Sequence, residues 1–179
     1  LFPYTTLFRS PEFHARYGPT AVVAGATEGI GRAFAHQLAE KGLRVRLCDV
    51  DADTFCVRQE TLAAWLGARR GPALVVHQFG HPAGRPELGS GPDGAAAERL
   101  ILSDAACAIG APEAMRGRAV CLSFHPRKVL TTGEGGVLVT ASDALAARLR
   151  RLRNHGMERT EVGMVFHEAG YNLRLTDLQ

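Results

Sequence analysis

A three-layer α/β/α fold built on a mostly parallel sheet is the architecture that this sequence predicts. Short apolar runs alternate with helical patterns along the chain, and most of those runs are hydrophobic throughout. Strands of that kind are typical of parallel sheets that helices cover on both faces. The composition, 46% hydrophobic and 22% charged over 179 residues, is that of a globular chain able to bury a core.

The expected strands and helices alternate from residue 20 onward. Apolar and β-branched runs predict strands over residues 20–24, 43–48, 73–77, 99–104, 119–124 and 137–140. Helical patterns predict one helix from Thr27 to a stop at Gly42, a second from Gln59 to a stop at Gly67, and a third over about 142–154. Residues 83–94 are rich in glycine, proline and serine, so we expect a loop or a ragged helix there.

Charge and cysteine content argue against several classes of function. The net charge of +3 is spread along the chain, and the one dense basic run, residues 148–153, alternates arginine with leucine as a solvated helix face does. No aromatic residues interleave with it, so we expect no nucleic-acid partner. The cysteines lack Cys-x-x-Cys spacing, which predicts no metal site and favours buried free thiols in a reducing cytoplasm. They are Cys48, Cys56, Cys107 and Cys121.

Targeting signals are not recognised in this sequence. No apolar run approaches the roughly 18 residues that a membrane helix needs, and we expect no signal peptide. Residues 1–10 read as a translated sequencing-adapter remnant, and residues 1–19 are expected to be adapter-like or disordered. We therefore expect the fold to begin at residue 20.

The most informative stretch places Lys128 between an apolar segment and a Thr/Gly-rich turn. It reads Ser-Phe-His-Pro-Arg-Lys-Val-Leu-Thr-Thr-Gly-Glu-Gly-Gly over residues 123–136. A lysine at a strand end suits Schiff-base formation with an aldehyde cofactor, because its amine must lose a proton and still reach the reacting carbon. An ordinary surface lysine is the alternative for this segment alone.

Asp104 is the second candidate for chemistry. It ends an apolar strand and leads into a run of small residues, 105–111, that would let a flat ring approach the backbone. A carboxylate there can pair with a protonated pyridine nitrogen and keep the ring electron-withdrawing. The alternative is a helix N-cap aspartate, which is common after strands.

Seven short runs carry a resemblance to a known family. They are Asp-Val-Asp-Ala-Asp-Thr-Phe at 49–55, Val-His-Gln-Phe-Gly at 76–80, Ser-Asp-Ala-Ala at 103–106, Ser-Phe-His-Pro-Arg-Lys at 123–128, Gly-Glu-Gly-Gly at 133–136, Leu-Arg-Asn-His-Gly at 152–156 and Gly-Tyr-Asn-Leu-Arg-Leu-Thr-Asp-Leu-Gln at 170–179. In this order they resemble the DegT/DnrJ/EryC1/StrS aminotransferases. Those pyridoxal-phosphate enzymes mostly aminate keto groups on nucleotide-linked sugars.

The resemblance implies that residues 43–179 form part of the large domain of a fold-type I pyridoxal-phosphate enzyme. Lys128 would bind the cofactor aldehyde and later carry the proton between cofactor and substrate carbons. Asp104 would face the pyridinium nitrogen, and Ser123 would help to hold the phosphate. Asn172 would reach the phosphate of a neighbouring subunit's cofactor in a homodimer. The substrates would be a nucleotide-sugar and an amino-acid donor, glutamate or glutamine, whereas His77 is expected to serve packing.

The chain also departs from the family pattern. Where the family usually has Glu-Asp-Ala-Ala followed by glutamine or histidine, this chain has Ser103 and Cys107. A thiol is a poor substitute for an amide or imidazole that contacts the hydroxyl of the cofactor ring. The family's upstream Ser-Gly-Thr phosphate loop, its ring-stacking aromatic residue and its small C-terminal domain have no counterpart in this sequence.

A second resemblance covers residues 20–42, which are similar to the nucleotide-binding start of short-chain dehydrogenases. Gly25, Gly29 and Gly31 follow a predicted strand and open a predicted helix, an arrangement that offers helix N–H groups to the pyrophosphate of NAD(P). Asp49 lies near the spacing of a ribose-binding acid, but it also opens the aminotransferase-like run. No tyrosine is followed four residues later by lysine, so the dehydrogenase's catalytic pair is missing.

Three interpretations remain open at this point. The longer resemblance favours a cytoplasmic pyridoxal-phosphate aminotransferase, truncated relative to its family. The glycine triad favours an NAD(P)-dependent short-chain dehydrogenase fragment. A chimeric inactive fragment, joined between these two parts, is the third.

Overall fold

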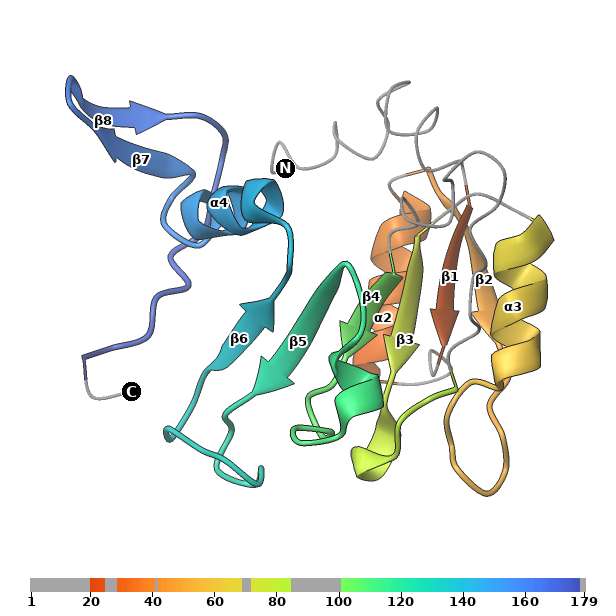
Figure 1. Ribbon diagram of the computed structural model, residues 1–179. Coiled ribbons are helices and arrows are strands. Elements are labelled where there is room, and N and C mark those ends of the chain that lie inside the picture. Colours follow the sequence, from red (N-terminus) through yellow and green to blue (C-terminus); the bar gives the residue numbers. More distant parts are fainter. Residues whose placement is uncertain (1–19, 25–28, 41, 69–71, 85–100, 178–179) are drawn as a thin grey trace.

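The computed structural model describes residues 20–24, 29–40, 42–68, 72–84 and 101–177. Its centre is a six-stranded sheet in the order β2-β1-β3-β4-β5-β6 (Figure 1). The strands are β1 (Thr20–Ala24), β2 (Arg44–Cys48), β3 (Ala73–Val76), β4 (Ile101–Asp104), β5 (Ala119–Ser123) and β6 (Gly136–Val139). The strands from β2 to β5 pair in parallel, and β6 pairs antiparallel with β5. The predicted α/β fold with a mostly parallel sheet is confirmed.

Two helices cover the half of the sheet that contains β1, β2 and β3. α2 (Gly29–Glu40) connects β1 to β2, and α3 (Gln59–Ala68) connects β2 to β3. These connections run along the sheet in opposite directions, so right-handed crossovers place the helices on opposite faces. Figure 1 shows α2 behind the strands. No helix in the described part of the chain has the length and apolar character needed to cross a membrane.

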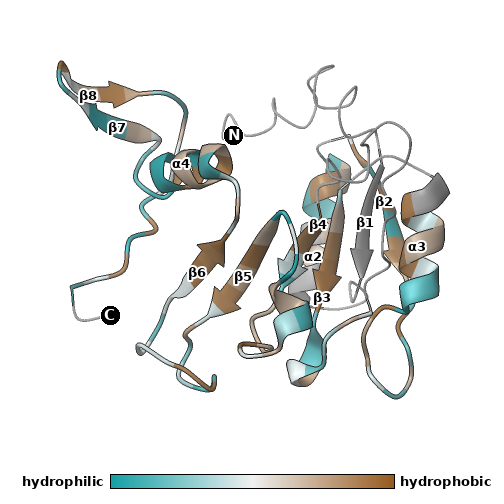
Figure 2. Ribbon diagram, in the orientation of Figure 1, coloured by the Kyte–Doolittle hydropathy of each residue, from teal (hydrophilic) through white to brown (hydrophobic). Residues whose placement is uncertain are grey.

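The main hydrophobic core lies between α3 and the sheet. Leu62 and Leu66 of α3 are each 2% exposed and pack against Val75 of β3 and Ile101 of β4. Figure 2 shows the same strands as the brown, hydrophobic centre of the molecule. Burying two leucine side chains contributes about 1.5–3 kcal/mol each, so this core fixes the sheet that carries the loops described below.

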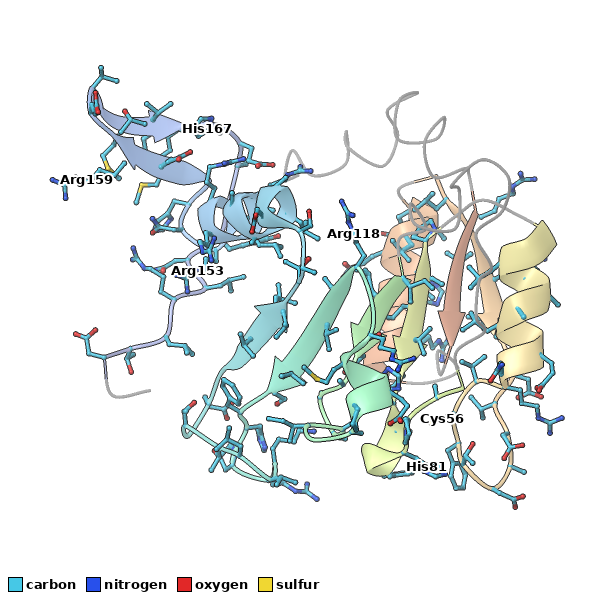
Figure 3. The ribbon with its side chains drawn as sticks, viewed as in Figure 1. Cys56, His81, Arg118, Arg153, Arg159 and His167 are labelled. Atoms are coloured by element: carbon cyan, nitrogen blue, oxygen red, sulfur yellow. The ribbon has the colours of Figure 1, made fainter. Side chains whose placement is uncertain are left out.

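Cys56 joins the loops that follow β2 and β3. Its Sγ donates to the carbonyl of His81 at 3.3 Å and accepts from the N–H of Gln78 at 3.4 Å, and Figure 3 labels Cys56 and His81 side by side. On these loops Phe55 and Phe79 both have positive φ, 56° and 53°. Their exposed rings meet edge to face with centroids 5.9 Å apart.

Beyond β6 the chain forms α4 (Asp143–Leu152) and a hairpin of β7 (Met157–Thr160) and β8 (Gly163–Phe166), visible at the left of Figure 1. The sequence suggested that the arginines of α4 form a solvated helix face, but two of them form ion pairs. Arg148 donates to both carboxylate oxygens of Glu168, and Nη1 of Arg151 lies 3.5 Å from Oε2 of Glu158. The basic run therefore faces acidic residues of the following segment, which the sequence spacing alone did not reveal.

Most predicted boundaries in the described part of the chain agree with the structure to within one or two residues. Gly67 lies inside α3, which continues to Ala68, so the predicted stop is wrong by a residue; a helical glycine costs only about 1 kcal/mol. The hairpin of β7 and β8 was not predicted. Strand β4 is described from Ile101 onward, and its predicted start at residue 99 lies outside the described residues. The predicted features at residues 1–19, Thr27 and 85–94 lie outside the described residues.

Candidate active site

Lys128 lies in the loop that connects the antiparallel strands β5 and β6. Its own N–H donates to the carbonyl of His125 at 2.9 Å. The loop is closed by the N–H of Phe124, which donates to Gly135, and by the hydroxyl of Thr131, which donates to Phe124 at 2.8 Å. Short-range hydrogen bonds therefore set the backbone of the lysine relative to both strands.

Asp104 ends the neighbouring strand β4 and turns the chain. Its Oδ1 accepts from the N–H of Ala106 at 3.0 Å, and the N–H of Ala105 donates to Cys121 on β5 at 2.9 Å. The carboxylate thus organises the turn that follows it, which is the capping-like role considered for it above. The same turn carries Cys107.

The side chain of Lys128 reaches this turn. Its Nζ lies 2.9 Å from the Sγ of Cys107, 21 residues earlier in the sequence. The structure therefore brings the predicted lysine to the loop that begins at Asp104. The expectation of buried thiols is wrong for Cys107, which is exposed in the turn beyond the end of β4.

Ser123 completes this group at the end of β5. In the parallel register Asp104 is paired with Cys121, and Ser123 lies two residues further along. Its Oγ accepts from the N–H of His125 at 3.3 Å, which leaves its own O–H available as a donor. Carboxylate, hydroxyl and amine thus follow the carboxyl ends of adjacent parallel strands, where open α/β sheets bind ligands.

The charge of Asp104 affects a neighbouring thiol. Burial raises the pKa of Cys121, and the negative charge of Asp104 raises that pKa further. Burial alone raises the pKa of Cys48. These two thiols are therefore held in the protonated form over a wider pH range than an ordinary cysteine.

Asn172 lies elsewhere, in the segment after the β7–β8 hairpin. It pairs by a β-bridge with Asn154, just beyond α4. The flanking hydrogen bonds join Tyr171 to Leu152 and His155, and Leu173 to Arg153. Within this chain the structure places Asn172 with the end of α4 and not with the ends of β4 and β5.

The other sequence candidates have structural surroundings. His77 is 4% exposed, and its Nδ1 accepts from the N–H of Ala83 at 2.9 Å, which fits the packing role expected for it. Gly29 and Gly31 lie in the first turn of α2, and Gly25 lies outside the described residues. In the described part of the chain no three His, Cys, Asp or Glu side chains group as metal ligands would.

Two features of the site were missed by sequence reasoning. The first is the contact between Cys107 and Lys128, which the sequence could not reveal because it depends on how the strands are arranged. A groove of about 890 Å³ lies across β5, β6 and α4 and is lined by apolar side chains including Leu122, Val137 and Leu149. Lys128 and Asp104 are not among its lining residues, but Phe124 and Gly135, which close the loop of Lys128, are.

Comparison with known proteins shows which family this chain is similar to. The profile of the DegT/DnrJ/EryC1/StrS aminotransferase family matches residues 32–179. GDP-perosamine synthase of Caulobacter vibrioides is 32% identical over 155 residues, 82% of this chain and 40% of the relative. The dTDP-4-dehydro-2,3,6-trideoxy-D-glucose 4-aminotransferase of Saccharopolyspora spinosa is 33% identical over 132 residues, 70% of this chain and 34% of the relative.

A solved structure gives the same result. The sugar aminotransferase CalS13 from Micromonospora echinospora superimposes with a TM-score of 0.68 at 30% identity, covering 89% of this chain and 46% of that one. The chain thus spans about 40% of the length of the GDP-perosamine synthase that it matches.

Proposed function

Because the chain belongs to the DegT/DnrJ/EryC1/StrS aminotransferase family, we propose that it carries the lysine-bearing part of an enzyme that uses pyridoxal phosphate to transfer an amino group to a keto group of a nucleotide-linked sugar. The relatives named above are a perosamine synthase and a dTDP-sugar aminotransferase. The observation that carries the proposal is the meeting of Lys128 with the turn that begins at Asp104.

The side chains at this edge of the sheet fit pyridoxal phosphate by their chemistry. Lys128 supplies an amine from the loop between β5 and β6, Asp104 a carboxylate from the end of β4, and Ser123 a hydroxyl from the end of β5. An aldehyde needs the amine, a pyridinium nitrogen needs an anion, and a phosphate needs a hydrogen-bond donor. Bound there, the cofactor would supply an electron sink for the carbanion that forms when a substrate carbon loses its proton.

Each residue has a separate role in this proposal. Nζ of Lys128 would bind the cofactor and then accept and return the proton of the substrate carbon, since a neutral amine is a suitable base. The carboxylate of Asp104 would hold the ring nitrogen protonated and fix the ring orientation. The O–H of Ser123 would donate to a phosphate oxygen while its Oγ keeps the bond from His125.

The remaining parts of the proposal depend on the family resemblance. Asn172 lies on an exposed segment, so it is available to reach the cofactor phosphate of a second copy in a homodimer. The amino donor would be glutamate or glutamine. Residues 43–179 would belong to the large domain, and β1 would be part of the same sheet, since it lies between β2 and β3.

The chain offers a clear test because it has two lysines, Lys41 and Lys128. Purified protein is mixed with pyridoxal phosphate, reduced with borohydride, digested and mapped by mass spectrometry. We expect the adduct on Lys128, its loss in Lys128→Arg and its retention in Lys41→Arg, the matched control. Absence of an adduct on Lys128, or equal labelling of both lysines, would contradict the proposal.

A second measurement distinguishes binding of pyridoxal phosphate from the dehydrogenase interpretation. Asp104→Asn removes the anion but preserves the shape of the side chain, so we expect a weaker visible absorbance of the bound cofactor and a blue-shifted ring spectrum. Protection of the chain from proteolysis by NADH, without any protection by pyridoxal phosphate, would instead favour the dehydrogenase interpretation of Gly25, Gly29 and Gly31.

A further inference from the structure

We propose that Cys107 and Lys128 form a reversible cross-link between sulfur and nitrogen when the protein meets a peroxide, and that this modification removes the lysine amine from chemistry. The two atoms that would be joined are Sγ and Nζ, which already lie 2.9 Å apart. This inference goes beyond the proposed function, because the cross-link requires neither cofactor nor substrate.

The backbone holds both partners in place. On one side, Ala108 donates to Ala105 and Asp104 accepts from Ala106, so the turn that carries Cys107 is pinned at both of its ends. On the other side, the N–H of Lys128 donates to His125. Atoms held at about 3–3.5 Å in a favourable orientation react as if at very high local concentration, and Nζ is already within that distance of the sulfur.

The first chemical step is oxidation of the thiol by hydrogen peroxide. The sulfur takes one oxygen atom, the O–O bond breaks and one water leaves, so that sulfur loses two electrons and becomes a sulfenic acid. Exposure decides which thiol reacts. Cys107 is exposed, whereas Cys48 and Cys56 are buried and Cys121 is half-buried.

The second step joins the two side chains. The lone pair of the neutral amine of Lys128 attacks the sulfenic sulfur, the S–O bond breaks, and the leaving hydroxide takes a proton from nitrogen to become a second water. The sum is one thiol, one amine and one peroxide giving one sulfenamide and two waters. Two equivalents of an external thiol reverse it, returning the free thiol and amine and forming one disulfide.

The cross-link would block the amine of Lys128. A lysine whose nitrogen is bonded to sulfur cannot condense with an aldehyde. The only other lysine in the sequence is Lys41. Oxidation at the single contact between Cys107 and Lys128 would therefore remove the amine that the candidate site needs. The cysteine at position 107, where the family usually has glutamine or histidine, would thus make Lys128 sensitive to peroxide.

The test uses the full chain, reduced and free of pyridoxal phosphate, treated with hydrogen peroxide, digested and mapped by mass spectrometry. We expect the peptide containing Cys107 to be joined to the peptide containing Lys128, with the mass of the sum less two hydrogen atoms. Dithiothreitol should reverse the joining. Lys41→Arg should leave it unchanged, and Cys107→Ser should abolish it.

A trap for sulfenic acid gives the decisive comparison. In Lys128→Arg the charge remains but the attacking amine is lost, so dimedone labelling of Cys107 should rise above that of the parent chain. In the parent chain, labelling of Lys128 by pyridoxal phosphate with cyanoborohydride should fall in proportion to cross-link and return after dithiothreitol.

Two results would overturn the inference. One is oxidation of Cys107 to a sulfinic acid or a disulfide while Lys128 stays free. The other is equal dimedone labelling in the parent chain and in Lys128→Arg. Neither result bears on the proposed function, since aldehyde labelling of Lys128 in the reduced chain tests that separately.

Discussion

At the scale of single residues, the four cysteines differ in what surrounds them. Cys107 is exposed, and Cys48 and Cys121 have raised pKa values because burial disfavours their charged forms. Thiolate is the form that reacts with alkylating agents. A raised pKa therefore slows labelling at any pH below it, and the rate recovers as the pH rises through it.

We expect iodoacetamide to modify the thiols in a fixed order. At neutral pH Cys107 should react first because it is exposed, and Cys48 and Cys121 should react far more slowly. Peptide mass spectrometry over a time course measures the rates. Similar rates for Cys107 and Cys121 in the folded chain would contradict the exposed position of the turn; unfolding in urea, which should equalise them, is the control.

Asp51 makes the stability of the fold depend on pH. Hydrogen bonds from the backbone N–H groups of Thr54 and Asp53, with the charge of Arg58, lower the pKa of its carboxyl from 3.8. A lowered pKa in the folded state means that ionised Asp51 stabilises the fold above pH 3.8 and that this contribution disappears as the pH falls through the folded value.

Asp51→Asn therefore has an effect that depends on pH. At neutral pH we expect a lower melting temperature than in the parent chain, because the charge-assisted bonds are lost. The difference should shrink as the pH falls below 3.8. Thermal unfolding followed by circular dichroism across that range measures it, and a difference independent of pH would argue against an ionic role for Asp51.

At the scale of elements, the closest packing joins two of the family-like runs. Gly156 ends the segment after α4 and has φ of +70°, and a side chain there would meet the backbone of Glu168. Gly170 begins the next run, and a side chain there would meet the backbone of Gly156 and Leu152. Only glycine leaves room for these chains to run side by side.

Alanine at either glycine should separate the C-terminal segment from α4. We expect Gly170→Ala to lower the stability of this region by about 1–3 kcal/mol, as inserting an extra methyl group into a closely packed site does, and to raise amide hydrogen exchange at Tyr171 and Leu173. Gly163→Ala is the control, since nothing lies within 4 Å of its added atom and only its positive φ opposes it. Unchanged exchange in Gly170→Ala would contradict the close approach.

The start of α4 depends on one hydroxyl. Ser142 is the N-cap, and its Oγ accepts from the N–H of Leu145 at 3.3 Å. Replacing it with alanine leaves that N–H without its partner and should cost about 1 kcal/mol, whereas aspartate should preserve the cap. Denaturant unfolding of Ser142→Ala and Ser142→Asp measures the difference, and equal midpoints would show that the cap contributes nothing.

At the scale of the whole molecule, the core between α3 and the sheet decides whether the edge that carries Lys128 forms. Leu62 is 2% exposed and Leu47 is 52% exposed. Leu62→Ala should cost about 2–5 kcal/mol through lost burial and a cavity, and Leu47→Ala much less. Chemical denaturation of both variants measures the costs. Comparable losses would mean that this core does not hold the sheet together.

The sequence predicted the sheet because its apolar runs are hydrophobic throughout. It singled out Lys128 and Asp104 by their positions near the ends of such runs, and Ser123 only through the resemblance to the family. It could not predict that Lys128 contacts Cys107, since that contact depends on which strands become neighbours. It also missed the hairpin of β7 and β8, whose strands alternate weakly and lie outside the main core. The proximity of the runs at 152–156 and 170–174 needed the fold as well.

The antiparallel pairing of β5 and β6 also bears on the order of folding. These strands are neighbours in the sequence, so the loop that holds Lys128 closes over a short length of chain, whereas β1 reaches β3 only after about fifty residues have been traversed. Contacts that are local in sequence form sooner than distant ones. The loop that holds Lys128 therefore closes early and at a small entropic cost, while the parallel half of the sheet is the slow part of folding.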